Sequence, residues 1–509
     1  MGFLPHIELA TALVLIPLIG ALGVLSWPDE PDGKGRISGG IALAVAVVEV
    51  GVWILTLKRF DFSAPQTIQL GQHHVWFKDL GVSYDVGFTA FGLWLVGLTA
   101  VVLTAAIAYA FWTGRTRANA YYALMLVLLG AIVGVFVAQD LLLFYAFFEA
   151  MLIPLYVLVG VWGGAGRLRA TLKFVLYTMA GSLLMLVSIL VFGIHNGSFS
   201  MYGPSLGATL PDHSTSSTLL FLGFMFAFAI KAPLVPFHGW LPDAYRESSP
   251  EVAAVLSGVV SKAAAYGFLY IAIHLFPGPA DDLRTPILVL ASIGLVYGSL
   301  LAFRAPDFRG VVAYSSLAQM GLITIGVFAQ SGLGWSGATL QMVNHGLISA
   351  ALFLLAGCVE RRTGTGELSQ LGGMARGRPV LATLTLTAGM IALAVPLSSS
   401  FAGEFLILAG VLNRGWGYSV VGAVAIVLAA MYVLRLISAV LHRDVGPAVK
   451  EDARDLGAWE LGVVAALLGC LLALSVWPAA ISEHTFGHDV VTDQPFSLIT
   501  ETPPTSAAP

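Results

Sequence analysis

The chain has few charged residues. Asp, Glu, Lys and Arg make up 11% of its 509 residues, whereas soluble globular proteins average about 25%. So few charges cannot cover a surface that faces water on all sides, and 57% of the residues are hydrophobic. The mean hydropathy of +0.86 agrees with this. The composition excludes a soluble globular protein and predicts an all-α polytopic membrane protein.

Cysteine, an excess of one charge and the usual cofactor motifs are also missing. The two cysteines, Cys358 and Cys470, fall in separate apolar runs, which excludes a disulfide framework and a cysteine-ligated cluster. With 25 basic and 29 acidic residues and no basic patch, we expect no nucleic-acid partner. The sequence has no Walker loop, no GxGxxG after a strand, no CxxC and no paired histidines placed for haem. Nothing in it predicts nucleotide hydrolysis or electron transfer.

Long apolar runs dominate what is present. A membrane-spanning helix needs roughly 20 mostly apolar residues. The first run lacks a basic n-region and is too long for a signal-peptide core, so we expect it to be retained. We predict fourteen spans, at about 5–27, 37–57, 87–113, 119–138, 141–163, 170–194, 218–240, 250–275, 285–303, 309–330, 335–360, 379–412, 418–442 and 457–481.

Two of these spans are predicted to be broken. In the seventh, Pro233 and Pro236 follow Lys231, and in the twelfth Pro396 precedes three serines. A proline removes an amide donor and frees a carbonyl of the preceding turn, and at membrane depth that carbonyl needs a side chain or water. Outside the spans, the alternating stretch 64–84 predicts a short extramembrane hairpin. The polar tail from Glu483 is expected to be poorly ordered.

Lysine and arginine in the loops predict the orientation. Sixteen lie in loops that follow odd-numbered spans and five in loops that follow even-numbered spans. The odd loops should therefore face the cytoplasm, and both termini should lie on the outer side. Only an even number of spans gives that arrangement.

Several ionisable residues lie inside the spans, where a charge costs at least about 2.5–3.5 kcal/mol and usually faces a partner or a wet cavity. Five of them sit near mid-span and cannot easily reach the interface, so we predict that they are functional. Two others lie nearer helix ends, where a structural ion pair or snorkelling is the stronger alternative, and Glu49 is a further, weaker candidate. The five are Glu149, Lys231, Lys262, His345 and Glu404, and the two are Lys173 and Arg435.

These positions recur at almost one offset. Lys262 and Arg435 are 173 positions apart, as are Lys231 and Glu404; Lys173 and His345 are 172 apart, and Glu149 and Gln319 are 170 apart. Spans 4–8 and 9–13 each contain five helices, so the second set must enter the membrane from the opposite side. Inverted repeats with helices broken near the midplane are typical of transporters.

The offset divides the chain into four parts. Residues 1–114 would hold helices 1–3 and the outer hairpin, and residues 115–278 the first inverted repeat. Residues 279–446 would hold the second inverted repeat, and residues 447–509 helix 14 and the polar outer tail.

The chemistry that fits such an array is a proton relay. A relay needs titratable groups joined by hydrogen-bonded water and proton affinities that change with their surroundings. If Glu149 approaches Lys231, the lysine should hold its proton, and if Glu149 withdraws, the lysine should release it. We expect one polar axis near mid-membrane to join the five mid-span residues.

Four segments carry a resemblance to a known family. They read LLLFYAFFEAMLIPLYVLVGVWGG, AFAIKAPLVPFHGWLPDAYRESSPEVAAVLSGVVSKAAAYG, QMVNHGLISAALFLLAG and SSFAGEFLILAG. Together they resemble the antiporter-like subunits of respiratory complex I and of the Mrp cation/proton antiporters, over about residues 87–442. In that family the position of Glu404 usually holds lysine, and glutamate there is typical of the M subunits. The chain length also favours the M type.

The resemblance implies roles for individual residues. Glu149 and Lys231 would be the coupling pair, Lys262 the connecting lysine, His345 a bridging group and Glu404 the terminal carboxylate. Two positions depart from the family. Gln319 stands in AYSSLAQMG where many relatives have histidine, and Tyr245 stands in LPDAYRESSP, in an expected loop, where histidine is common. Since Gln319 cannot titrate, a relay here must use water or another group.

The resemblance also implies the setting. The chain would be a redox-inactive, proton-translocating subunit of a NADH:quinone oxidoreductase in a bacterial inner membrane. It would carry no cofactor or metal of its own, and NADH, FMN, iron–sulfur clusters and quinone would belong to other subunits. Its partners would be the other membrane subunits, including neighbouring antiporter-like ones. Two alternatives stay open: a subunit of an Mrp-type sodium/proton antiporter or membrane-bound hydrogenase, and an inert structural scaffold.

Overall fold

The computed structural model describes residues 8–28, 35–78, 81–202, 213–450 and 453–486. Its first half contains α1 Leu9–Leu25, α2 Arg36–Arg59, β1 Gln69–Phe77, β2 Val82–Phe88, α3 Ala90–Thr113, α4 Ala118–Val137, α5 Leu141–Ala150, α6 Leu152–Trp162, α7 Arg167–Asn196, α8 Thr215–Lys231, η2 Phe237–Trp240, α9 Leu241–Glu247, α10 Pro250–Val255, η3 Leu256–Val260, α11 Ser261–Gly267 and η4 Phe268–Ile273. The second half contains α12 Pro277–Asp282, α13 Arg284–Arg304, α14 Phe308–Phe328, α15 Gly332–Thr363, α16 Pro379–Ala392, α17 Ser399–Leu412, α18 Trp416–Ile437, η5 Ser438–His442, α19 Ala458–Val476 and α20 Ala479–Ser482.

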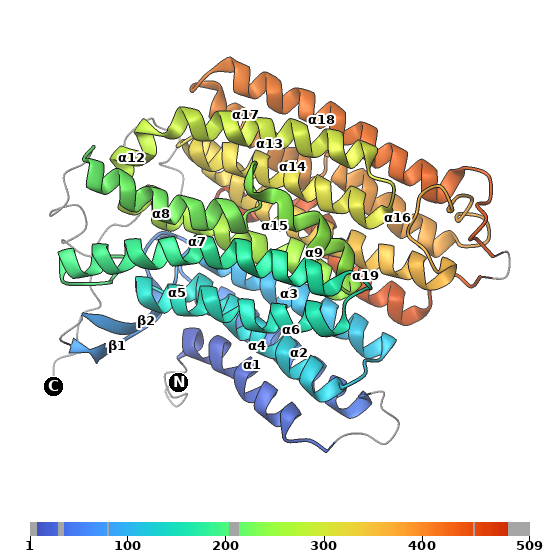
Figure 1. The fold of residues 1–509 in the computed structure, drawn as a ribbon, viewed down its shortest axis with the longest axis horizontal. Coiled ribbons are helices and arrows are strands. Elements are labelled where there is room, and N and C mark those ends of the chain that lie inside the picture. Colours follow the sequence, from blue (N-terminus) through green and yellow to red (C-terminus); the bar gives the residue numbers. More distant parts are fainter. Residues whose placement is uncertain (1–7, 29–34, 79–80, 203–212, 451–452, 487–509) are drawn as a thin grey trace.

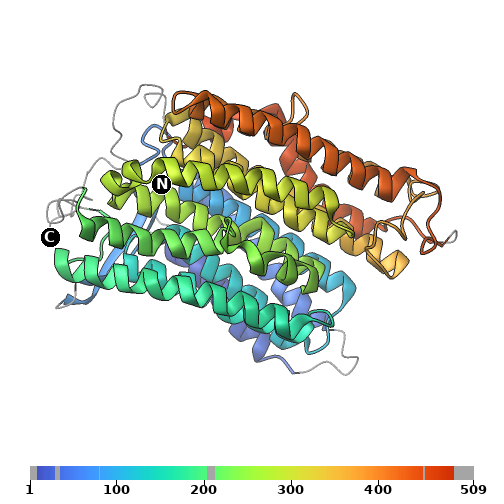
Figure 2. The same ribbon diagram turned by 45° about the horizontal axis from the view of Figure 1, so that its top comes forward.

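The long helices lie side by side in one bundle (Figure 1). The N-terminal helices α1 and α2 form one edge of the bundle and α18 forms the opposite edge, and the turned view keeps this order (Figure 2). Two helical segments are buried along the whole apolar window, namely α15 and the continuous helix α10–η4. The centre of the bundle is therefore built from helices that carry His345 and Lys262.

The predicted spans agree with the helices. Each of the fourteen ranges contains at least one helix. Within the described part of the chain, eleven helices are long and apolar enough to cross a membrane, and four shorter apolar helices add to them. The prediction of a polytopic helical membrane protein is confirmed, while the count of fourteen crossings stays a prediction.

Both predicted breaks are present. α8 ends at Lys231, and helical structure resumes only at Phe237, past the two prolines. The twelfth range is divided into α16 and α17, with residues 393–398 outside either helix. The Ser398 hydroxyl caps α17 by accepting from the Phe401 amide over 3.2 Å, as expected of a serine at a helix N-terminus.

The structure adds irregularities that we did not predict. The fifth span divides into α5 and α6 at Met151, because Pro154 has no amide with which to continue the helix back to Ala150. The eighth span contains two π-helical turns, η3 and η4, on either side of the short helix α11 that holds Lys262. Turns of this kind occur often at functional sites.

The outer segments confirm one prediction and correct two. β1 and β2 form the expected antiparallel hairpin, with His73 opposite Asp85. It begins five residues later and ends four residues later than the predicted stretch 64–84. Tyr245 lies in α9 and is fully buried, so placing it in a loop was wrong. The tail is packed as far as Phe486, which is 4% exposed and accepts a hydrogen bond from Gln66 over 2.6 Å. Residues 487–509 lie outside the described part.

Two glycines bring the central helices together. A Cβ on Gly346 of α15 would lie 2.7 Å from the Gly258 carbonyl, and a Cβ on Gly258 of η3 would lie 3.0 Å from the Gly346 carbonyl. Only glycine allows so close an approach of two backbones. Because Gly346 follows His345 and Gly258 is one turn before Lys262, this contact places the two titratable side chains beside each other.

A bidentate ion pair fastens α19 to the end of α15. Arg362 donates to both carboxylate oxygens of Glu460 over 2.7 Å, and the two side chains are 12% and 2% exposed.

Arg362→Leu should destabilise the protein by about 3–5 kcal/mol, because the Glu460 carboxylate would stay buried without its partner. The thermal unfolding of the purified assembly measures this. Arg284→Leu, which breaks a pair whose Asp281 is 56% exposed, should cost less than about 1 kcal/mol. Equal losses of stability in Arg362→Leu and Arg284→Leu would show that the buried ion pair does not stabilise the protein more than the exposed one.

Candidate functional site

Lys231 occupies the end of α8, where the helix breaks. The break is closed by Trp240, whose indole donates to the Ile230 carbonyl over 2.9 Å. The Lys231 side chain is 2% exposed. Its Nζ donates to the Phe148 carbonyl over 3.0 Å and lies 3.9 Å from the centroid of the Phe148 ring. Carbonyls in the last turn of a helix lack intrahelical partners, so the unpredicted end of α5 supplies the acceptor for Lys231.

Lys262 and His345 form the centre of a buried polar cluster. Lys262 is fully buried, and its Nζ lies 2.7 Å from His345 Nδ1 and donates to the Ser257 carbonyl over 2.6 Å. The other ring nitrogen, His345 Nε2, lies 3.2 Å from the Ser316 hydroxyl, which is 2.7 Å from the Ser257 hydroxyl. Lys262 is therefore joined to α14 and α15 by groups that can exchange protons.

Glu404 forms a second cluster with two glutamines. The carboxylate is 2% exposed, and its Oε1 accepts from Gln319 over 3.0 Å and from Gln341 over 3.4 Å. Gln341 also donates to the Gln319 carbonyl oxygen over 2.9 Å. Gln319 thus holds the Glu404 carboxylate and is itself held by Gln341.

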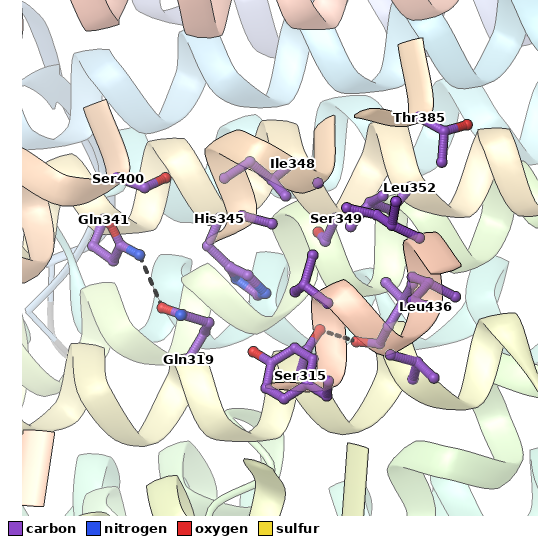
Figure 3. Close-up of a pocket in the computed structure, with 17 residues that line it drawn as sticks. Ser315, Gln319, Gln341, His345, Ile348, Ser349, Leu352, Thr385, Ser400 and Leu436 are labelled. Atoms are coloured by element: carbon purple, nitrogen blue, oxygen red, sulfur yellow. Dashed lines mark hydrogen bonds between the residues drawn. The ribbon is translucent and has the colours of Figure 1, made fainter. Parts of the chain in front are cut away.

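One helical turn separates the two clusters on each of two helices. Gln341 and His345 are neighbours on α15, and Ser316 and Gln319 are neighbours on α14, because positions three or four apart share a helix face. Figure 3 shows Gln341 and Gln319 joined at one end of this face, with His345 beside them.

Among the described residues, no hydrogen bond joins Lys231 to the Lys262 cluster, so that part of the predicted axis stays a prediction.

An internal cavity of about 30 Å³ adjoins both clusters. Its wall is formed by α14, α15, α16, α17 and α18 (Figure 3). Polar groups enter it from several sides, among them His345, Gln319, Gln341, Ser400 and Thr385. A water needs roughly 10–15 Å³ of such space and two to four polar partners, so the cavity has room for about two waters.

Glu149 lies near Lys231 without an ion pair. It belongs to the last turn of α5 and is only partly buried, and no ion pair of the described chain includes it or Lys231. Glu149 directly follows Phe148, which binds Lys231. Lys231 instead depends on the carbonyl and the ring of Phe148.

The two lesser candidates lie apart from the buried clusters. Lys173 donates to Asp243 over 2.8 Å in a pair whose side chains are 35% and 42% exposed. Arg435 is partly buried, donates to the Ala305 carbonyl over 3.0 Å and lies over the Phe303 ring. Both environments fit the alternative that these two residues have a structural role and no part in the relay. Glu49 is fully buried on α2, and neither of its carboxylate oxygens has a hydrogen-bond partner among the described residues.

Sequence reasoning missed the hydroxyl and amide groups that join the charged residues. Lys262 contacts Ser257, and His345 contacts Ser316. Glu404 contacts Gln341. A lone serine in an apolar span carries no distinct signal in the sequence. Gln341 could have been found, because it is four residues before His345 and shares its face.

The fold and the site define a helical membrane transport protein whose charged side chains lie buried beside broken helices. A family model described as NADH:quinone oxidoreductase/Mrp antiporter, transmembrane region, matches residues 138–430. The chain belongs to this family.

Individual relatives agree with that assignment. The NADH-quinone oxidoreductase subunit M of Mycobacterium tuberculosis is 35% identical, over 92% of this chain and 91% of its own length. A chain of the respiratory complex I from Thermus thermophilus with bound NADH superposes with a TM-score of 0.83 at 29% identity, over 94% of this chain and 97% of its own. A chain of the Mrp complex from Dietzia sp. shares the fold, with a TM-score of 0.82 at 22% identity, over 94% of this chain and 96% of its own.

Proposed function

We propose that this chain is the M-type, proton-translocating membrane subunit of a respiratory NADH:quinone oxidoreductase. The observation that carries the proposal is the contact of Lys262 Nζ with His345 Nδ1 at 2.7 Å, with both residues buried in the centre of the bundle. A buried cation beside a histidine serves proton exchange better than it serves stability, because two such groups cannot both be charged without a large cost. The identity to M subunits over nearly the whole chain supports the assignment.

Protons would pass along the buried clusters in an order set by geometry. Lys231 receives or releases a proton as Glu149 approaches or withdraws, and Lys262 passes its proton to His345 through their hydrogen bond. Glu404, held by Gln319 and Gln341, is the terminal carboxylate. NADH oxidation and quinone reduction, with FMN and iron–sulfur clusters, take place in other subunits, which supply the energy.

The location follows from the same proposal. The subunit spans a bacterial inner membrane beside other antiporter-like subunits, and the arginine-rich loops face the cytoplasm. The identity to M subunits over 92% of the chain favours the respiratory enzyme over an Mrp-type antiporter, for which the likeness at 22% identity concerns the fold alone.

Glu404→Gln should impair proton transport more than folding. The substitution keeps the shape and the contacts with Gln319 and Gln341 but removes the titratable group. We expect normal assembly, reduced NADH-driven acidification of inverted membrane vesicles and, where coupling is tight, slower NADH oxidation. Wild-type pumping in the assembled variant would show that Glu404 is not the terminal group.

A further inference from the structure

The two contacts of the Lys231 ammonium group come from one residue. Its Nζ donates to the Phe148 carbonyl over 3.0 Å and lies over the Phe148 ring, 3.9 Å from the centroid. Lys231 is 2% exposed and Phe148 is 1% exposed, so bulk water does not replace either contact. A buried ammonium group is costly unless its surroundings favour the charge, and here Phe148 supplies that support.

The helices around α8 supply no acid that could take this place. The elements that pack most against α8 are α7, α11, α12, η2 and η4. Their acidic residues in the described chain are Asp281 and Asp282 of α12, which pair with Arg284 and His213. His213 precedes the start of α8, a whole helix length from Lys231 at its end. The other titratable side chains of these elements are cations, tyrosines and histidines.

Packing fixes the Phe148 ring beside the lysine. The ring stacks on Phe144, one turn earlier on α5, with centroids 5.6 Å apart, and meets Phe228 of α8 edge-on at 5.9 Å. Phe228 is three residues before Lys231, so α8 carries both the lysine and a ring that packs against Phe148. Gly267 of α11 leaves room for Phe228, because a Cβ there would lie 2.3 Å from that ring.

The other cation–ring contacts of the described chain differ from this one. All four involve arginine, which does not lose its proton in proteins. Arg115 and Arg246 also have acidic partners, and Arg361 and Arg435 are exposed or partly exposed. Lys231 is therefore the cation for which a ring contact can control whether a proton is kept.

We propose that Phe148 is a positioning residue for proton transfer, whose ring and carbonyl keep the proton on Lys231 while Glu149 is withdrawn. The inference rests on the proposed function, in which Lys231 gives up its proton in one step of the relay. The face of an aromatic ring attracts a cation, and the attraction is larger where water is excluded. No bond forms or breaks at the ring, and the proton stays on Nζ until the next group of the relay accepts it.

Phe148 and Glu149 belong to one helical turn, which couples their positions. α5 ends at Ala150 and α6 begins at Leu152, so this turn lies at a break. Successive side chains of a helix point about 100° apart, so one of the two can face Lys231 while the other faces away. A rotation of the turn would exchange the carboxylate for the ring. The ring is neutral and holds the charge less strongly, so it leaves the lysine able to pass its proton on.

Fluorination of the ring tests this role without removing its packing. Fluorine withdraws the negative charge from the ring face that attracts the cation. Trifluorophenylalanine at position 148 should reduce NADH-driven proton uptake into inverted vesicles, with normal assembly and normal thermal stability. The same replacement of Phe144 is the matched control, because Phe144 belongs to the same stack and has no cation contact among the described residues. It should transport protons like the wild type.

Genetic variants show whether Phe148 acts through Lys231. Phe148→Leu should lower proton transport, per assembled complex, towards the level of Lys231→Met, and Phe148→Tyr, which keeps a ring face, should retain more transport than Phe148→Leu. The double variant Phe148→Leu, Lys231→Met should transport no less than Lys231→Met alone. If Phe148→Leu does not assemble, the fluorinated ring decides the question.

The outcomes distinguish this role from the function on which it rests. If Lys231→Met transports protons like the wild type, the proposed function is wrong. If Lys231→Met fails while the fluorinated ring at position 148 has no effect, the relay stands and the role of Phe148 is wrong. Equal losses from fluorination at positions 144 and 148, or a further loss in the double variant, would also overturn it, because packing or another site would then explain the effect.

Discussion

Lys262→Met should abolish proton transport by this subunit while the complex still assembles. Lys262 is fully buried, and its Nζ contacts the Ser257 carbonyl, the Ser261 hydroxyl and His345 Nδ1, so it joins η3, α11 and α15. Methionine preserves the length and the apolar stem of the side chain but cannot bind a proton. His345 would then lose the group from which it receives protons, and transfer towards Glu404 would stop.

The measurement is NADH-driven proton uptake into inverted vesicles, normalised to the amount of assembled complex. Lys58→Met is the matched control, because Lys58 is exposed at the end of α2 and should tolerate the loss of its charge. Transport at the wild-type level in Lys262→Met would remove Lys262 from the relay. Loss of the assembled complex would instead give Lys262 a structural role.

The spans and the broken helices could be predicted because their causes are local. An apolar run of about twenty residues has one stable arrangement in a bilayer, and a proline in a helix interior removes a backbone hydrogen bond, which favours a break there. Pro17 shows that the break is not obligatory, because α1 continues through it. Pro233, Pro236 and Pro396 predict breaks on this ground, and the structure confirms both breaks. Pro154 carried the same signal, and the helix end at Met151 could have been predicted from it.

The contacts between charged residues could not be predicted in the same way. The sequence marks Lys262 and His345 as costly, but only the approach of Gly258 to Gly346 brings them together. A regular offset along the chain also does not make two positions equivalent. Lys262 is fully buried while Arg435, 173 positions later, is partly exposed and bound to a backbone carbonyl.

Glu149 and Lys231 should be coupled in transport but not in stability. In this structure Lys231 is held by the Phe148 carbonyl and ring, and Glu149 makes no ion pair with it. Glu149→Gln and Lys231→Met should each reduce proton transport, and the double variant should lose no more than either single variant. The two residues act on one step of the relay, and residues that act as a unit are not additive.

Their effects on thermal stability should add to within about 0.5 kcal/mol, as for groups that share no direct contact. A double-mutant cycle on the assembled complex, scored separately for proton transport and for unfolding, measures both quantities. A coupling in stability of about 3 kcal/mol would mean that the ion pair, absent here, dominates the resting state. Additive losses of transport would show that the residues do not interact. Glu149, which is partly exposed at the end of α5, would then belong to the interface with a neighbouring subunit, and the release of the Lys231 proton would need another trigger.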